Sequence, residues 1–464
     1  MAHPLIESLP SVADRGDFER VQALVAASGR KLVVLDDDPT GTQTVHGIPV
    51  LTEWSVASLA TALRETGPCF YVLTNTRALA LPAAAALNRE LAHNLTAAAR
   101  ATGRTFTVVS RGDSTLRGHF PGEVDALAAA LGEPVDGTLL IPAFFEGGRY
   151  TIHGVHYVAD GARLVPAGKT EFARDATFGY RSSALADWVE EKTAGRVRAA
   201  DVAHIAIETL RGADGAAAVC AQLLALPRGK VIAVDAAAYA DLEVFVHGLL
   251  QAEAAGRRYV ARTAAGYVRV RAGITPRALL SAAEIAPPSS SGGLIVVGSY
   301  VAKTTQQLEA ALAAPHVAAT EVHVDRLLDP AARADEIARA AAAADAAMRA
   351  GRHALLFTSR QLVSAVGRAG ELGTAQTVSS ALVAIVQALR ERPRFFIAKG
   401  GITSSDLATQ GLGVKKALVL GQAAPGIPVW RLGPESRFPG LAYVVFPGNV
   451  GGPDTLRELI ARLG

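Results

Sequence analysis

The sequence contains few cysteines, few aromatic residues and little net charge, and each shortage excludes a class of protein. Two cysteines, Cys69 and Cys220, are too few for a disulfide framework or a zinc site. The 46 basic and 43 acidic residues give a net charge of +3, and the 6% of aromatic residues do not cluster with basic ones as a nucleic-acid-binding surface requires. No apolar run approaches the roughly 18 residues of a membrane span, and the opening residues lack a secretory signal. We therefore expect a cytoplasmic protein with no nucleic-acid or membrane partner.

Short β-branched runs alternate with alanine-rich segments along the whole chain, which favours an α/β fold with parallel sheets. The run PPSSSGG at 287–293 cannot build a core and leads directly into a new strand. We therefore predict two domains, residues 1–286 and 294–464, joined by a linker at 287–293, each built on a largely parallel sheet flanked by helices. Residues 333–351 have helical spacing, and the predicted strands are 31–35, 70–74, 106–110, 138–143, 204–208, 230–236, 294–299, 321–325, 354–359, 395–400, 417–421 and 443–448.

Four consecutive predicted strands of the first domain are followed by polar residues: DDD (36–38), NTR (75–77), RGDSTLRGH (111–119) and FFEGGR (144–149). Ligands of open α/β sheets bind beyond the carboxyl ends of the strands, so these segments are expected to form one site. Carboxylates accept hydrogen bonds from hydroxyl groups, and arginine binds a carboxylate through two parallel bonds. The mixture therefore fits a small polyol that also carries an anionic group.

The three consecutive aspartates, Asp36 to Asp38, have three interpretations. Their position at a strand end favours ligand binding, whereas the following DPTG is good turn chemistry and favours capping alone. Metal ligation is the weakest interpretation, because neighbouring strand residues point to opposite faces and no His-rich or Cys-rich segment lies near. The metal ligands therefore stay unassigned.

The second domain has glycines after three predicted strands, in GS (298–299), GGITSS (400–405) and PGNVGG (447–452). Glycine lets backbone N–H groups approach a phosphate, and a helix N-terminus attracts anions. Tight turns between strands and helices also require glycine, so the pattern has a structural explanation as well. We predict that these three strand ends form a nucleotide site.

Six segments taken together resemble the four-carbon acid sugar kinases: DDDPTGTQT (36–44), TNTR (74–77), SRGDSTLRGHFPGE (110–123), TEFARDATFGY (170–180), KGGITSSDLA (399–408) and FPGNVGGPDTL (446–456). The resemblance runs from about Leu32 to Leu456. It implies a sugar-acid-binding domain, a nucleotide-binding domain and ATP-dependent phosphorylation of the terminal (4-) hydroxyl of a four-carbon acid. Overall similarity favours D-threonate, with D-erythronate and 3-oxo-tetronate as alternatives. Thr44 departs from the family, in which a further aspartate is common at this position.

The resemblance and the strand-end pattern together give an expected site. Arg77 and Arg111 are expected to clamp the acid's carboxylate, and Asp37 and Asp113 are the candidate catalytic residues. A magnesium ion is expected with ATP, a homo-oligomer is compatible with the sequence, and a non-catalytic sensor of sugar acid and nucleotide is the alternative from another class. The expected substrate-binding residues are Asp37, Asp38, Arg77, Ser110, Arg111, Gly112, Asp113, Ser114 and Arg117, and the expected ATP-binding residues are Ser299, Gly400, Gly401, Ile402, Thr403, Ser404, Gly448, Asn449 and Gly451.

Overall fold

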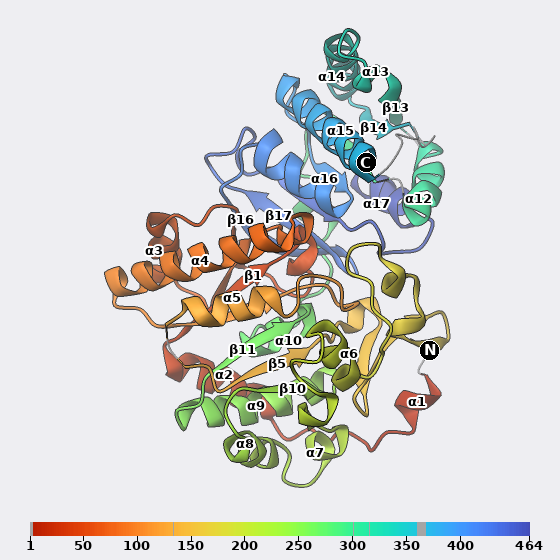
Figure 1. Cartoon of the computed structure of the whole chain (residues 1–464). Coiled ribbons are helices and arrows are strands. Elements are labelled where there is room, and N and C mark those ends of the chain that lie inside the picture. The colour runs from red at the N-terminus through yellow and green to blue at the C-terminus, as the bar shows by residue number, and fades with distance from the viewer. Residues whose placement is uncertain (1–2, 133, 300, 315, 360–367) are drawn as a thin grey trace. The chain divides into compact units, whose positions relative to one another are not determined.

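The computed structural model describes residues 3–132, 134–299, 301–314, 316–359 and 368–464 (Figure 1). The chain divides into two compact units, Met1–Pro276 and Arg277–Gly464, so the predicted linker segment 287–293 belongs to the second unit. Within the described ranges, no helix is both long enough and apolar enough to cross a membrane.

The first unit is built on a parallel sheet, as the sequence predicts. Its strands lie in the order β2-β3-β1-β4-β11-β5-β10-β9, and every neighbouring pair is parallel. The strands are β1 (Lys31–Asp36), β2 (Ile48–Leu51), β3 (Cys69–Leu73), β4 (Phe106–Arg111), β5 (Gly137–Ile141), β9 (Ala203–Ile205), β10 (Lys230–Val234) and β11 (Tyr259–Thr263).

Helices cover both faces of this sheet, which explains why all six residues of β1 are buried. On one face, Val33 and Leu35 of β1 belong to a core with side chains of α3, α4, α5 and α6, of which α4 and α5 lie side by side in Figure 1. A second group, α2, α8, α9 and α10, packs together through α9. The helices of this unit are α1 (Pro4–Glu7), α2 (Asp17–Ser28), α3 (Val56–Arg64), α4 (Leu81–Thr102), α5 (Gly122–Ala130), α6 (Leu185–Lys192), α7 (Ile207–Arg211), α8 (Gly215–Ala225), α9 (Tyr239–Ala254) and α10 (Ala265–Arg271).

A small antiparallel sheet that the sequence did not predict follows β5. It consists of β6 (Arg149–Ile152), β7 (Val155–Asp160) and β8 (Arg163–Pro166). In β7 partly buried residues alternate with buried ones up to Val158, so only one side of this strand faces a core. The three runs are short and contain polar residues, which is why they were not predicted as strands.

The second unit has a mixed sheet in the order β13-β14-β12-β15-β18-β17-β16. The pairs from β13 to β18 are parallel, whereas β16, β17 and β18 form an antiparallel meander. The predicted strand 417–421 lies within β16, whereas its antiparallel partner β17 was not predicted. The strands are β12 (Leu294–Val297), β13 (Val317–Val322), β14 (His353–Thr358), β15 (Phe396–Lys399), β16 (Lys416–Ala424), β17 (Ile427–Leu432) and β18 (Ala442–Phe446).

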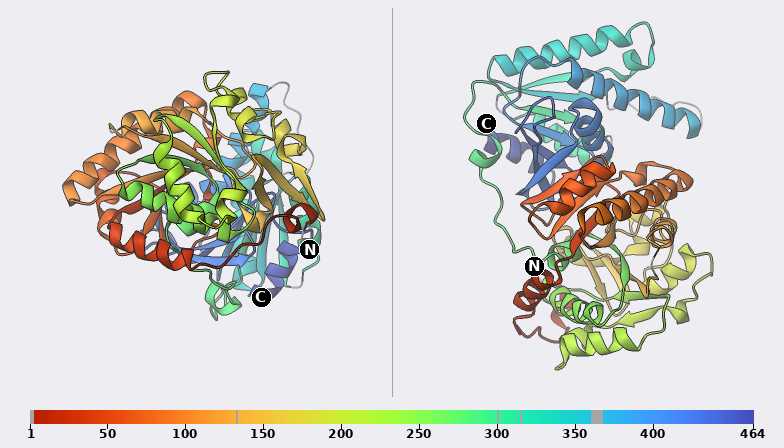
Figure 2. Two further views of the ribbon diagram at one scale, coloured as in Figure 1. Left: turned by 90° about the horizontal axis from the view of Figure 1, so that it is seen from below. Right: turned by 90° about the vertical axis from the view of Figure 1, so that its left-hand side faces the viewer.

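Helices pack around this sheet too. α11, α12 and α17 share a core with β12, β15 and β18, and the long helices α14 and α15 pack on one another, as Figures 1 and 2 show. The helices are α11 (Ala282–Ile285), α12 (Ala302–Leu312), α13 (Val324–Leu328), α14 (Arg333–Arg349), α15 (Arg368–Ala388), α16 (Gly401–Asp406) and α17 (Thr455–Leu463), with a π-helical turn at Leu407–Gly411 after α16.

Candidate functional site

The carboxyl ends of β1 and β4 bring an aspartate and an arginine together. The parallel register places Asp36 beside Arg111, and Arg111 Nη1 lies 3.0 Å from Asp36 Oδ1 in a pair that is almost completely buried. Burial raises the pKa of Asp36 to about 7, although the Arg111 guanidinium opposes this shift. A Cβ on Gly41 would lie 2.1 Å from Asp36 Oδ2, so only glycine fits beside this carboxylate.

Asp37 lies one residue beyond the end of β1 and meets the arginine that follows β3. Arg77 donates to both carboxylate oxygens of Asp37, with Nη2–Oδ1 at 2.8 Å and Nε–Oδ2 at 3.3 Å. Arg111 Nη1 lies 3.8 Å from Asp37 Oδ1, so Asp36 and Asp37 approach the same guanidinium. The expectation that these two carboxylates diverge assumed a strand running through both, and β1 ends at Asp36. The positively charged group that lies near both Asp36 and Asp37 is the guanidinium of Arg111.

Asp38 caps the turn that follows it, as the DPTG pattern allowed. Its Oδ1 accepts hydrogen bonds from the Thr40 backbone N–H at 2.8 Å and from the Thr40 hydroxyl at 2.5 Å. Burial alone would raise the pKa of Asp38, but Arg77 and Thr40 together hold it below its usual value. The other oxygen, Oδ2, lies 3.6 Å from Arg77 Nη2, so this carboxylate serves both the turn and the charge network.

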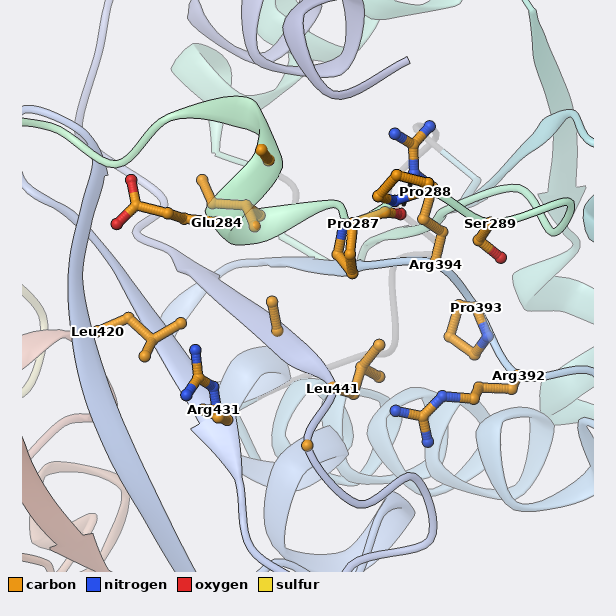
Figure 3. Close-up of a pocket in the computed structure, with 14 residues that line it drawn as sticks. Glu284, Pro287, Pro288, Ser289, Arg392, Pro393, Arg394, Leu420, Arg431 and Leu441 are labelled. Carbon is orange, nitrogen blue, oxygen red and sulfur yellow. Dashed lines mark hydrogen bonds between the residues drawn. The ribbon is translucent and has the colours of Figure 1, made fainter.

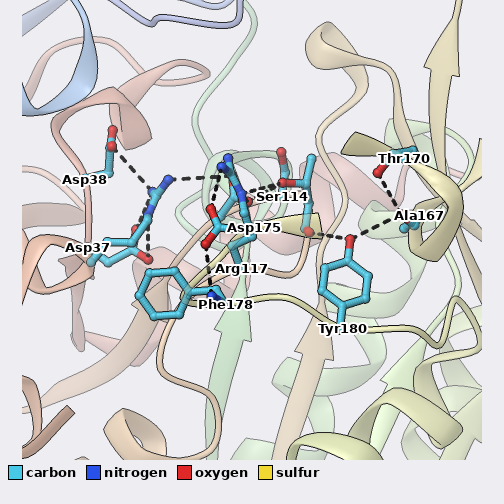
Figure 4. Close-up of polar contacts among 12 residues, drawn as sticks. Asp37, Asp38, Ser114, Arg117, Ala167, Thr170, Asp175, Phe178 and Tyr180 are labelled. Atoms are coloured by element: carbon cyan, nitrogen blue, oxygen red, sulfur yellow. Dashed lines mark hydrogen bonds and ion pairs between the residues drawn. The ribbon is translucent and has the colours of Figure 1, made fainter. Parts of the chain in front are cut away.

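The loop after β4 contributes Asp113 and Arg117. Arg117 Nε donates to Asp113 Oδ2 at 2.8 Å, Thr115 donates to the same oxygen, and Arg77 Nη1 lies 3.7 Å from Asp113 Oδ1. Burial would raise the pKa of Asp113, but Arg117 and Arg77 outweigh it and hold this pKa far below its usual range. Arg117 Nη1 also lies 3.5 Å from Asp175 Oδ2 (Figure 4). Asp175 was missed as a candidate, although it lies in the segment 170–180 that resembles the family.

Two buried side chains hold the backbone of this loop. His156 Nε2 donates to the Ser114 carbonyl at 2.7 Å, and the Thr151 hydroxyl donates to His156 Nδ1 at 3.0 Å. Burial lowers the pKa of His156 to about 4, so the ring is neutral, in agreement with one donating and one accepting nitrogen. Tyr180 donates its hydroxyl to the Thr115 carbonyl at 2.7 Å (Figure 4).

The structure thus brings most of the predicted acid-binding residues into one network, but they differ in exposure. The side chains of Arg77 and Arg117 are 18% and 20% exposed, whereas those of Arg111 and Asp37 are both 4% exposed. Ser110 is buried within β4 beside Leu35, and Gly112 donates its backbone N–H to the Thr263 carbonyl at 2.9 Å. Arg77 and Arg117 are therefore more accessible from solvent than Arg111.

Arg262, at the end of β11, is a further member of the network that the sequence analysis missed. Its Nη2 donates to the Arg117 carbonyl at 2.8 Å and lies 3.9 Å from Asp37 Oδ2. Ligands of such sheets bind beyond the carboxyl ends of the strands, so Arg262 would have been a candidate if the run YVART had been recognised as a strand.

In the second unit, the glycine-bearing ends of β12, β15 and β18 converge on Ser299. A Cβ on Gly400 would lie 3.0 Å from the Ser299 Cβ, and one on Gly448 would lie 3.5 Å from the Ser299 hydroxyl oxygen. Gly400 has a φ of 120°, which side-chain-bearing residues rarely adopt. Thr304 of α12 donates to the Gly448 carbonyl at 3.1 Å and ties this loop to the helix. The three strand ends predicted for a nucleotide therefore do meet.

The remaining predicted nucleotide-binding residues differ in burial and in the contacts of their side chains. Ser404 is fully buried and donates its hydroxyl to the Ala398 carbonyl at 2.8 Å, so its side chain supports the turn instead of facing a ligand. Ile402, by contrast, is 59% exposed at the first turn of α16. The Thr403 hydroxyl packs near Gly298 and Gly400, where added Cβ atoms would meet it. Gly401 is the first residue of α16, directly after Gly400, and Asn449 and Gly451 lie on the loop that carries Gly448.

Lys399, the last residue of β15, is completely buried directly before this glycine pair. Its Nζ donates to the Pro447 carbonyl at 2.6 Å and lies 4.0 Å from the centre of the Phe446 ring. Burial lowers its pKa to about 7, and the Lys303 charge contributes to the shift. Lys399 thus holds the start of the loop that carries Gly448.

A cavity of about 510 Å³ also lies in the second unit (Figure 3). It opens at the amino-terminal ends of β15 and β18, whereas the glycine-bearing segments follow their carboxyl ends. Arg394 donates to the carbonyls of Ala286 and Pro287, both at 2.9 Å, and so fixes the beginning of the predicted linker segment. The lining residues include Pro287, Pro288, Arg392, Arg394, Arg431 and Leu441, none of them predicted to bind nucleotide.

The residues present fit a nucleotide better than a protein-held metal. Two glycines and a helix start frame Ser299, so backbone N–H groups can approach phosphates there. Among the described residues, no group of three or more His, Cys, Asp or Glu side chains is arranged to hold a metal ion. A Mg²⁺ ion bound through nucleotide phosphates and water needs few protein ligands.

Two family models match different parts of this chain. Residues 32–271 match a family model described as a sugar-binding N-terminal domain, and residues 294–456 match one described as a nucleotide-binding C-terminal domain. The charged network lies in the first match and the glycine-bearing strand ends lie in the second.

Two curated relatives have kinase names. A D-erythronate kinase of Heliobacterium modesticaldum is 31% identical over 232 residues, which are 49% of this chain and 47% of that protein. A 3-oxo-tetronate kinase of Cupriavidus necator is 28% identical over 375 residues, which are 77% of this chain and 78% of that protein. The chain thus matches only about half the length of the first relative.

Solved structures show the same fold at low sequence identity. A protein of Salmonella typhimurium LT2 superposes with a TM-score of 0.66 at 20% identity, covering 93% of this chain and 98% of that one. A Haemophilus influenzae protein superposes with a TM-score of 0.61 at 18% identity, covering 92% and 98%. With both domain models matched in order, this chain belongs to the four-carbon acid sugar kinase family.

Proposed function

We propose that this protein is an ATP-dependent kinase that phosphorylates the terminal (4-) hydroxyl of a four-carbon sugar acid. The observation that carries the proposal is the network of three aspartates and two partly exposed arginines within the segment that matches a sugar-binding domain. A short acid with several hydroxyl groups presents one carboxylate for the arginines and several donors for the aspartates.

Arg77 and Arg117 are proposed to bind the substrate carboxylate, since they are the more exposed guanidinium groups of the network. Arg111 was expected to share this role, but it is nearly buried and engaged by Asp36. We assign it to holding Asp36 and Asp37 in place. Asp38, Asp113 and Ser114 would then accept hydrogen bonds from the hydroxyl groups of the carbon chain.

Asp37 and Asp113 are the candidates to receive the proton of the attacking hydroxyl. The low pKa of Asp113 makes it a weak base, although phosphoryl transfer depends more on positioning and charge neutralisation than on proton removal. Replacing the true base by asparagine is expected to lower kcat by about 10²-fold or more. The Asp37→Asn and Asp113→Asn variants, compared at saturating substrate, therefore distinguish the two assignments.

For ATP, the loops that carry Ser299, Gly400, Gly401 and Gly448 would hold the phosphates through backbone N–H groups. Ile402, Thr403, Asn449 and Gly451 would complete the lining, while the buried Ser404 supports it from behind. Mg²⁺ would supply charge neutralisation on the phosphates. Direct transfer requires both ligands to be bound at once, so initial-rate plots with both substrates varied should intersect instead of running parallel.

Three acids need to be compared: D-threonate, which the sequence favours, and D-erythronate and 3-oxo-tetronate, which appear in the names of the relatives. A coupled assay of ADP release with each acid, at equal enzyme and ATP concentrations, identifies the preferred substrate by kcat/KM. Reactions without added acid are the control for ADP release that does not depend on the acid. ATP and acid binding without ADP release from any of the three would refute the kinase proposal and favour a non-catalytic sensor.

A further inference from the structure

Arg262 is buried where three strands of the first unit end side by side. β11 lies between β4 and β5, and the register places Arg262 beside Ser110 on one side and Leu140 on the other. The residue is 5% exposed, so its charge is held almost entirely within the protein. A buried arginine needs partners to offset the loss of hydration.

Two glycines leave the space that the Arg262 guanidinium occupies. A Cβ on Gly112 would lie 1.1 Å from Arg262 Nη1, and one on Gly118 would lie 2.8 Å from Nη2. Gly118 also has a φ of 116°, which disfavours any other residue. These glycines begin and end the loop 112–118, which carries Asp113 and Arg117. The Arg262 guanidinium therefore lies between the two ends of this loop.

The contacts of Arg262 join this loop to Asp37. Nη2 donates to the Arg117 carbonyl at 2.8 Å and lies 3.9 Å from Asp37 Oδ2. Nη1 is buried without a hydrogen-bond partner among the described residues. An unsatisfied buried donor is unfavourable, so packing alone does not explain an arginine at this position.

We propose that Arg262 is a positioning residue of the sugar-acid site: lodged between Gly112 and Gly118, it holds the loop 112–118 against Asp37. Arg117 and Asp113 then face the same ligand as Arg77 and Asp38. This inference rests on the proposed function, because it assigns Arg262 to recognition of the acid and to no part of ATP binding.

The experiment measures acid binding and catalysis in Arg262→Ala, Arg262→Lys and Gly112→Ala. Arg262→Ala is expected to raise the acid's Kd and KM about tenfold or more, with the KM for ATP unchanged. Arg262→Lys is expected to be intermediate, since a lysine keeps the charge but not the planar fork of donors. Gly112→Ala should reproduce the defect, because its Cβ would displace the guanidinium.

The double variant Gly112→Ala/Arg262→Ala is expected to be no worse than Gly112→Ala alone, because both changes remove the same contact. Arg271→Ala is the matched control: Arg271 has the same 6% side-chain exposure and a buried ion pair with Glu253 at 2.7 Å, outside the network. It should lower the melting temperature comparably and leave the acid's KM unchanged.

Unchanged acid binding in Arg262→Ala, with a wild type that binds and phosphorylates the acid, overturns the positioning role and leaves the kinase proposal standing. An equal rise of the acid's KM in Arg271→Ala also overturns it, because the defect would then reflect general destabilisation. If the wild type binds no four-carbon acid by calorimetry, both proposals fail together.

Discussion

Replacing Lys399 by methionine tests the consequence of burying an amine beside the predicted phosphate loops. The side chain is fully buried, and burial lowers its pKa from 10.5 to about 7. At about 1.4 kcal/mol per pKa unit, this shift corresponds to about 5 kcal/mol of destabilisation when the amine is charged in the folded state. Methionine has a similar length and no charge, so it removes this cost. It also removes the bond to the Pro447 carbonyl, at a pH-independent cost of about 1–3 kcal/mol.

The pH dependence follows from the direction of the shift. Between about pH 7 and pH 10.5 the unfolded state holds a proton on Lys399 that the folded state lacks, so wild-type stability rises with pH. Below pH 7 both states are protonated and this contribution is constant. The stability advantage of Lys399→Met should therefore be constant below pH 7 and shrink by about 2 kcal/mol between pH 7 and pH 9.

Urea unfolding at pH 6, 7, 8 and 9 measures this difference. Trp430 is the single tryptophan of the second unit's sequence, so a background with phenylalanine at Trp54 and Trp188 reports that unit alone. Lys415→Met is the control, because Lys415 is an exposed lysine of the same unit whose charge is not among the causes of the Lys399 pKa shift. A stability difference between Lys399→Met and wild type that stays constant from pH 6 to pH 9 would refute the reasoning, since Lys399 would then be charged throughout.

Three further substitutions test the two sites. Arg77→Ala is expected to raise the KM for the acid about tenfold or more and leave the KM for ATP unchanged, because it removes an exposed guanidinium from the charged network; steady-state kinetics with each substrate varied decide this. Gly400→Val should abolish ATP binding in calorimetry while acid binding persists, since its Cβ would lie 3.0 Å from that of Ser299 at a φ of 120°; normal ATP affinity would contradict the nucleotide assignment. Gly41→Ala should lower the unfolding free energy by about 3 kcal/mol or more, because its Cβ would lie 2.1 Å from Asp36 Oδ2 and disrupt a buried ion pair; a variant as stable as wild type would show that the carboxylate can move aside.

The strand ends were the most predictable part of the acid site. Because β1, β3 and β4 are neighbours in a parallel sheet, the residues that follow them had to converge, and Asp37, Arg77 and Asp113 do so. Arg262 escaped prediction because the run YVART was not recognised as a strand and because β11 lies far along the chain from β4, with which it pairs. Pairing between distant strands is not encoded in any local pattern.

Residue roles within the site were less predictable than its location. Ser404 lies in the most typical phosphate-binding segment, yet its hydroxyl is used by the Ala398 carbonyl. Arg111 and Arg77 look equivalent in the sequence, because each lies at or just after a strand end. In the structure Arg111 is almost completely buried in an ion pair with Asp36, whereas the Arg77 side chain is partly exposed. Which donors remain for a ligand depends on which ones the protein itself has already engaged.

The sequence by itself determined the α/β class, the parallel strands of both units and the order of a charged segment followed by a glycine-bearing one, because hydrophobic periodicity and strand-end residues are local properties. Only the tertiary structure decided that Arg262 enters the space beside Gly112, that Asp36 forms an ion pair with Arg111, and that Lys399 is buried without an acidic partner among the residues that the structure describes. These arrangements depend on burial and on pairing between distant segments, which fix the charge state and the free donors of a side chain only after the chain has folded.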